Sequence, residues 1–294
     1  MSEIRAAGAR VRRVEEMANR TPISNLTTDR QLIERCRSWL APHFLDDEDF
    51  WAMQFQSWIL EIDGRIFVID PCNGNGRPHA AFPMFDMLET PYLERFAAAG
   101  VRPEDVDVVF CTHFHHDHCG WNTQLRDGRF VPTFPNARYV FVRREYERWN
   151  PARAGHREVA FNIGVFERSI EPVMAAGLAE LVEDRHRISP SVAIEPAYGH
   201  TMGHSILHLT NDGEEAYFSG DVIHHPIQIA DPEVHFFGCD SLPDAIATRR
   251  GLIDTCARSG ALIIPAHFPA PHAGWIRRAS DGGTVFEAYR SGVG

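Results

Sequence analysis

The segment THFHHDHCGWN at residues 112–122 holds the densest set of groups that could do chemistry. It contains an H-x-H-x-D-H pattern and directly follows DVDVVFCT, an apolar run that predicts a short buried strand. Imidazoles and a carboxylate next to buried backbone are costly unless something binds them. Nitrogen and oxygen ligands at this spacing suit zinc-like divalent ions. The segment therefore predicts a metal site, with the ligands His113, His115, Asp117 and His118.

Three later segments supply further ligands of the same kinds. GHTMGHS at 199–205 holds His200 between glycines, while FSGD and IPAHF place Asp221 and His267 just past apolar strands. Polar groups at successive strand ends commonly meet at one edge of a sheet. The seven side chains together predict a site for two divalent ions. Zinc is the favoured ion, and iron, manganese and cobalt use the same ligands.

Composition excludes several other classes of protein. The 294 residues have a net charge of −11 and contain no lysine, which argues against a nucleic-acid partner, a P-loop and Schiff-base chemistry. No stretch reads as a signal peptide or a membrane span, so we expect a cytoplasmic protein without a membrane partner. The cysteines lack CxxC pairs, and Cys111 and Cys119 are interpreted as reduced packing residues.

The strands and helices predicted from the rest of the sequence would position these ligands. Strand signals occur in clusters that are each followed by a helix, which predicts an α/β (α+β) protein with two packed sheets and helices outside. Residues 1–27 are interpreted as a loosely held arm and 28–294 as one catalytic domain. A helix is predicted at 28–44, with Thr28 or Asp29 as its N-cap, and another at 241–259. Residues 143–187 are predicted to be a mostly helical cap over the site.

Taken in order, the segments resemble the metallo-β-lactamase-fold hydrolase superfamily. The matching elements are Asp70 after a strand, the H-x-H-x-D-H segment, GHTMGH, SGD and the late PAH, over roughly residues 57–270. The resemblance implies a four-layer αββα sandwich of two mixed sheets, with the metals at one edge. It implies one ion on His113, His115 and His200 and another on Asp117, His118 and His267, with Asp221 bridging both. His204 and Asp70 would orient ligands.

The branch of the superfamily follows from Asp221. True β-lactamases of this fold usually carry a cysteine there, whereas the aspartate is similar to lactonases, including N-acyl-homoserine lactonases, esterases, glyoxalase II enzymes and organophosphate hydrolases. The predicted reaction is hydrolysis of a small lactone or carboxylic ester by hydroxide generated between two ions. The alternatives are phosphotriester or thioester hydrolysis and a mononuclear iron enzyme like the sulfur dioxygenases.

Other roles at the site stay open in the sequence. Asp117 could shuttle a proton to the leaving group. The segment VIHHPIQI lacks the tyrosine that often serves as oxyanion donor in acyl-homoserine lactonases, and His224 or His225 could replace it. Each of these two histidines could equally be structural. An apolar face on residues 28–60 would suit a homodimer.

Overall fold

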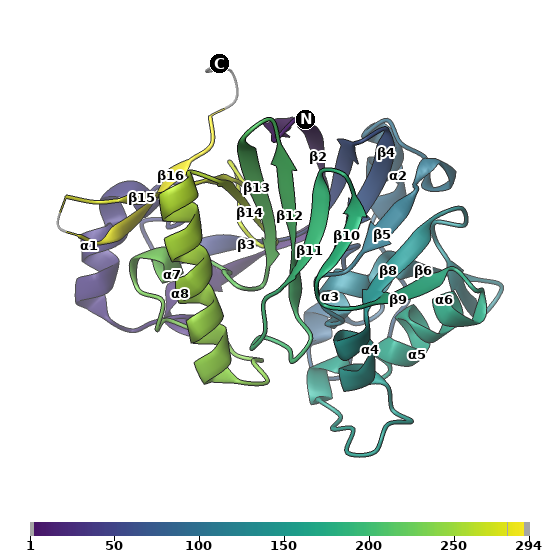
Figure 1. The fold of residues 1–294 in the computed structure, drawn as a ribbon. Helices are drawn as coiled ribbons and strands as arrows, with labels where there is room; N and C mark the ends of the chain where they lie inside the picture. Colours follow the sequence, from purple (N-terminus) through teal and green to yellow (C-terminus); the bar gives the residue numbers. More distant parts are fainter. Residues whose placement is uncertain (1–2, 281, 291–294) are drawn as a thin grey trace.

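Two seven-stranded sheets pack face to face in the computed structural model, which describes residues 3–280 and 282–290 (Figure 1). The first sheet has the order β1-β2-β3-β4-β5-β8-β9 and the second the order β10-β11-β12-β13-β14-β15-β16. The strands of the first sheet are Ile4–Ala6, Ala9–Pro22, Phe50–Ile62, Arg65–Ile69, Val108–Phe110, Arg138–Val142 and Ala179–Val182. Those of the second are His186–Ser189, Val192–Pro196, Ser205–Asn211, Glu214–Gly220, Leu262–Pro265, Gly274–Arg278 and Thr284–Ala288. A separate hairpin pairs β6 (Thr123–Arg126) with β7 (Arg129–Pro132).

Both sheets are mixed. Strands β4, β5, β8 and β9 run parallel, as do β13 and β14, and the other pairs are antiparallel. Parallel neighbours need a crossover connection, and in this chain the crossovers carry helices. The carboxyl ends of β5, β13 and β14 are therefore followed by the loops that hold the predicted ligands.

Helices cover both outer faces (Figure 1). Their bounds are α1 Arg30–Leu40, α2 Tyr92–Ala98, α3 His116–Cys119, α4 Arg143–Trp149, α5 Val165–Ser169, α6 Glu171–Ala175, α7 Ile227–Ala230 and α8 Leu242–Ser259. One apolar cluster lies between the sheets and joins Trp58 and Phe110 of the first to Leu207 and Phe218 of the second. Two further clusters pack the outer faces against helices, with α2, α5 and α6 on the first sheet and α1, α7 and α8 on the second. The predicted αββα sandwich is confirmed. No helix in these described ranges is long and apolar enough to cross a bilayer.

Residues 1–27 are not an arm where the structure describes them. Residues 9–22 form β2, which pairs along its length with β3, and Val11 and Val14 are buried. A bulge between Glu15 and Met17 shifts the two-residue alternation, so that Val14 and Glu16 are buried before it and Thr21 after it. Because the bulge and the many arginines hide the alternation, the sequence of this strand looks irregular.

The predicted helical cap over 143–187 is also too long. Helices α4 to α6 end at Ala175, and strands β9 and β10 begin at Ala179 and His186. The other helix predictions hold more closely. Asp29 caps α1 by accepting from the backbone N–H groups of Gln31 and Leu32, and α8 ends at Gly260 in the left-handed region, with φ of 75°.

Candidate metal centre

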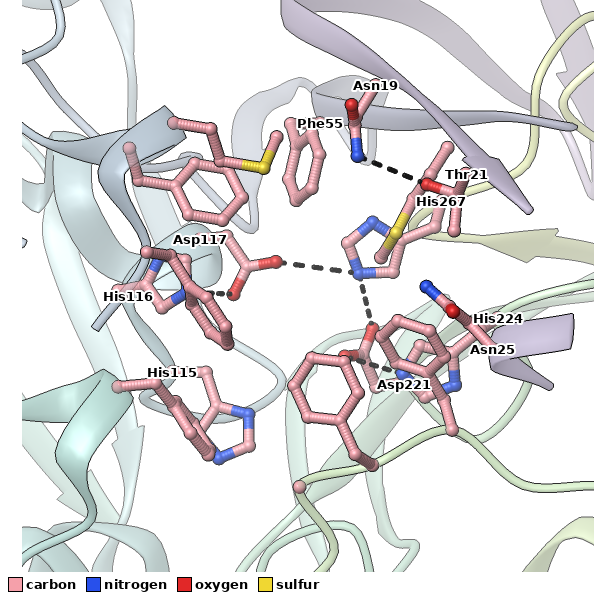
Figure 2. Close-up of a pocket in the computed structure, with 18 of the residues that line it drawn as sticks. Asn19, Thr21, Asn25, Phe55, His115, His116, Asp117, Asp221, His224 and His267 are labelled. Carbon is pink, nitrogen blue, oxygen red and sulfur yellow. Dashed lines mark hydrogen bonds and ion pairs between the residues drawn. The ribbon is translucent and has the colours of Figure 1, made fainter. Parts of the chain in front are cut away.

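The seven predicted ligands lie together at the edge where the two sheets meet their loops. Five of them line one pocket (Figure 2): His115, Asp117, His200, Asp221 and His267. His113 and His115 follow β5, and Asp117 and His118 lie on the short helix α3. The other ligands follow β11, β13 and β14 in chain order: His200, Asp221 and His267. Four separate segments of the sequence therefore supply one cluster.

One group of the cluster consists of His113, His115, His200 and Asp221. The Nδ1 atom of His115 lies 3.0 Å from Nε2 of His113 and 3.0 Å from Nε2 of His200. One donor atom from each of the four residues lies within 4.8 Å of all the others. These are the three histidines to which the resemblance assigned one ion, together with Asp221, which it assigned as the bridge.

The second group consists of Asp117, His118 and His267. The Oδ2 atom of Asp117 lies 3.7 Å from the Nε2 atoms of both His118 and His267. Asp221 lies between the groups: its Oδ1 is 3.0 Å from His267 Nε2 and 3.3 Å from His118 Nε2, while its Oδ2 is 3.2 Å from His200 Nε2. One carboxylate oxygen thus faces each group, as a bridging ligand would.

The donor set fits divalent ions. The Nε2 atoms of His118 and His267 and the Oδ1 atom of Asp221 are buried and, within the described chain, have no hydrogen-bond partner, although both nitrogens lie within 3.3 Å of that oxygen. Buried polar atoms that lie this close together without forming hydrogen bonds raise the free energy of the folded protein. Ions with nitrogen and oxygen ligands would satisfy all three atoms.

Outer contacts fix the orientation of the ligands. The Nδ1 atom of His267 donates to the backbone carbonyl of Gln54 (2.8 Å), which leaves Nε2 as the metal-facing atom. His118 Nδ1 lies 3.0 Å from a carboxylate oxygen of Asp70. His204 Nε2 accepts from the backbone N–H of Asp221 at 3.1 Å. Asp70 and His204 therefore occupy the orienting positions that the resemblance implied.

The electrostatics divide the histidines of the cluster into two kinds. Burial, reinforced by the surrounding imidazoles, lowers the pKa of His113 and His115 well below the usual range of histidine. At His118, His200 and His267 the charge of Asp221 outweighs burial and raises the pKa. Burial alone would raise the pKa of Asp221, but the surrounding histidines outweigh it and hold that pKa well below its usual range. Metals bind neutral imidazoles and ionised carboxylates, so the three histidines with raised pKa must release protons when a metal binds.

The two histidines proposed for the oxyanion differ in position. His224 lines the pocket with its Nε2 3.2 Å from Asp221 Oδ2. His225 points the other way, and its Nε2 donates to the carbonyl of Phe44 (2.7 Å) while its Nδ1 accepts from the N–H of Ile227 (3.1 Å). Both ring nitrogens of His225 are therefore used in hydrogen bonds away from the pocket, which favours the structural interpretation of this residue.

Two buried glutamates hold the ligand loops, and sequence reasoning missed both. Glu145 of α4 accepts hydrogen bonds from Phe114 N, Trp149 Nε1, Thr201 Oγ1 and Gly203 N. Glu16 of β2 accepts from Asn73 N, Asn73 Nδ2, Gly74 N and Trp121 Nε1. Each lies in a charged stretch of sequence that reads as solvent-exposed, so no local signal marks them.

Close backbone packing explains one glycine of the GHTMGHS segment. A Cβ on Gly203 would lie 2.2 Å from the backbone nitrogen of Glu145. The glycine thus lets the loop that carries His200 pack directly on α4, where Glu145 accepts the Gly203 N–H.

The cysteines beside the first motif take no part in the cluster. Cys111 and Cys119 are buried, and their sulfurs contact the side chain of Asn122 and the carbonyl of His115. None of the candidate metal groups among the described residues contains a cysteine. The packing interpretation agrees with these contacts.

Sequence comparison identifies the family. Residues 53–280 match the model of the metallo-beta-lactamase superfamily. The chain belongs to this superfamily. The match contains all seven ligands of the cluster and leaves β1, β2 and α1 outside it. A search of curated proteins found no match.

Solved structures share the superfamily fold at low sequence identity. A crystal structure of the hydrolase AbOPH is 23% identical, with a TM-score of 0.80 over 98% of this chain and 97% of the other. AidC, a dizinc quorum-quenching lactonase in complex with a product, is 17% identical, with a TM-score of 0.76 over 98% and 97%. A probable metal-dependent hydrolase from Staphylococcus aureus is 15% identical, with a TM-score of 0.72 over 99% and 100%. These likenesses extend to β2, which lies outside the family match.

Proposed function

We propose that this protein hydrolyses a small lactone or carboxylic ester with two divalent ions, preferably zinc, held by the seven-ligand cluster. The observation that supports the proposal most directly is the position of Asp221, with one carboxylate oxygen toward each histidine group. A carboxylate in this position can bridge two neighbouring ions. The fold likeness to a dizinc lactonase is consistent with this choice of chemistry.

Bound ions would acidify a water molecule and polarise the substrate carbonyl. The protein's own groups then have separate tasks. Asp117 directs Oδ2 toward His118 and His267, and its other oxygen, Oδ1, lies 3.9 Å from His116 Nε2. We assign to Asp117 Oδ1 the transfer of a proton to the departing alkoxide. The oxyanion role goes to His224, because of the two candidates it is the one that lines the pocket.

The pocket above the cluster suits a partly apolar substrate. It opens to solvent, has a cavity volume of about 230 Å³, and is walled by Phe55, Phe82, Phe85, Phe161, Phe236 and Phe237. Apolar walls with a few placed polar groups are typical of pockets that bind small organic ligands. Acyl or aryl groups of an ester or lactone would pack on these rings.

The test combines metal analysis with a substrate panel. Purified protein is measured for metal content per chain and assayed against lactones, aryl esters, a thioester and a phosphotriester, before and after chelation. Two ions per chain with chelator-sensitive cleavage of lactones or esters is the expected result. A content of one iron per chain with no hydrolysis would overturn the proposal in favour of a mononuclear iron enzyme. Preference for the thioester or the phosphotriester would instead change the proposed substrate class.

A further inference from the structure

One segment of the chain carries both a metal ligand and part of the pocket wall. Residues 221–238 follow β13 and supply Asp221, His224, Phe236 and Phe237 to the pocket, and Figure 2 shows the first two of these side chains next to each other. Within residues 221–238 the only regular element is the short helix α7. Backbone groups of such an irregular segment need partners from elsewhere in the fold. The position of Asp221 therefore depends on what holds this segment.

Arg249 of α8 binds the backbone of this segment at three points. Its Nε donates to the carbonyl of Val222, and its Nη1 donates to the carbonyls of Pro232 and Val234, each at 2.7 Å. The side chain is only 1% exposed. Val222 directly follows the bridging ligand of the metal cluster, and Val234 precedes the two phenylalanines of the pocket wall. One guanidinium group thus holds both ends of the segment.

A buried glutamine connects these two ends. Gln228 Nε2 donates to the same Val234 carbonyl at 3.0 Å. Its Oε1 accepts from the backbone N–H groups of His224 (2.7 Å) and His225 (3.2 Å). Because Arg249 and Gln228 share one carbonyl, hydrogen bonds link α8 without a break to the backbone of His224.

The charge of Arg249 is balanced by carbonyl oxygens and not by a carboxylate. Burial lowers the pKa of Arg249 to about 10, so the side chain is still a cation at neutral pH. Within the described ranges it forms no ion pair, and Glu233 nearby pairs with Arg250 instead. Apolar side chains can often replace buried charged groups without loss of stability. A guanidinium offers what they cannot, which is several donors in a rigid fork that fixes the positions of their acceptors.

We propose that Arg249 is a positioning residue of the metal centre, which sets the geometry of Asp221 and His224 through the backbone of residues 222–234. It belongs to none of the ligand groups among the described residues, and it does not line the pocket. This inference rests on the metal site of the proposed function. It adds a support on α8, on the side of the cluster where Asp221 leaves the second sheet.

The experiment measures metal binding in Arg249→Met and Arg249→Lys. Competition with a coloured chelator gives metal affinity, and the visible absorption of the cobalt-loaded protein reports coordination geometry. Loss of an outer contact to a metal ligand typically costs 10- to 100-fold in affinity. Since Arg249 acts through the backbone, Arg249→Met should lower affinity by about tenfold and change the cobalt spectrum. Arg249→Lys keeps the charge without the fork, and it gives the same test with a smaller change if Arg249→Met does not fold.

Arg12→Met is the matched control. Arg12 is also a buried arginine that donates to a backbone carbonyl, that of Ala99, and it does not line the pocket. Urea unfolding in chelator compares the stability of the variants without metal. Unchanged metal affinity and cobalt spectrum in the folded Arg249 variants, whatever their stability, would overturn the positioning role, as would an equal change in Arg12→Met. These measurements need no turnover, so a failure to hydrolyse lactones or esters would count against the proposed function alone.

Discussion

The carboxylate of Glu145 accepts a hydrogen bond of 2.8 Å from the backbone N–H of Phe114, the residue between His113 and His115. Its other oxygen accepts from the Thr201 hydroxyl at 2.7 Å, in the loop that carries His200. One buried side chain thus fixes both loops that present the first histidine group. Helix α4 acts as a support for the metal site, although none of its residues belongs to the ligand cluster.

Glu145→Gln should therefore lower metal affinity. The side-chain NH2 group of the new glutamine would face N–H or O–H donors that the carboxylate of Glu145 now accepts from, so one of the two loops must move. Loss of such outer contacts typically costs 10- to 100-fold in metal affinity, and we expect a change of about that size. Competition with a coloured chelator measures it. Glu147→Gln on the same helix, at a partly exposed residue, is the control, and equal affinity in both variants would remove the supporting role of Glu145.

His118→Ala tests the two-ion assignment. Removing one ligand from the second group should reduce metal content from about two ions per chain toward one and lower kcat/KM more than about 100-fold, because even outer partners are worth 10- to 100-fold. Element analysis and turnover are measured on the same sample. Full activity with a single remaining ion would show that the second group is dispensable.

The positions of the ligands could be predicted because each lies in a short segment with its own signal. Asp221 directly follows an apolar strand, His113 comes three residues after the end of another, and glycines flank His200. Local patterns cannot show which way a loop residue points. His224 and His225 are adjacent and identical in type, and only the turn that leads into α7 directs one to the pocket and the other to Phe44.

The buried residues that support or line the site could not be predicted from the sequence, for a related reason. Glu16 is buried two residues after Val14 in the alternation of β2, and Thr21 reaches the pocket only because β2 pairs with β3. These positions depend on strand pairing between segments about 30 residues or more apart, which a single sequence does not encode as a local pattern.

His225 should make stability depend on pH. Burial lowers the pKa of His225 to about 4, from about 6.5 in an unfolded chain. Below pH 6.5 the unfolded chain gains a proton that the native imidazole cannot accept until about pH 4, so stability is complete above 6.5 and is lost between these values. The loss from this residue is on the order of 3 kcal/mol.

Urea unfolding between pH 4 and 7.5, in chelator, measures this loss. His225→Gln should be less stable than the parent at pH 7.5, because it leaves buried backbone partners unmatched, but its stability should fall less steeply with acid. Parallel stability curves for the two proteins would show that His225 does not carry the pH dependence.

The phenylalanine rings that wall the pocket should determine which acyl chain length the protein prefers. The ring centroids of Phe161 and His115 are 5.0 Å apart, and the Phe161 ring stacks on Phe82. The Phe161 ring therefore lies beside the metal cluster, where the apolar chain of a bound ester would extend. Phe161→Ala should lower kcat/KM by about tenfold for a hexanoyl ester, mainly through KM, and by less than about threefold for the acetyl ester, which cannot reach the ring. Ile163→Ala is the matched control, since Ile163 is 52% exposed in the same segment and does not line the pocket. An equal loss for both esters would mean that Phe161 supports the ligand loop and does not bind the acyl chain, and metal content would then fall with activity.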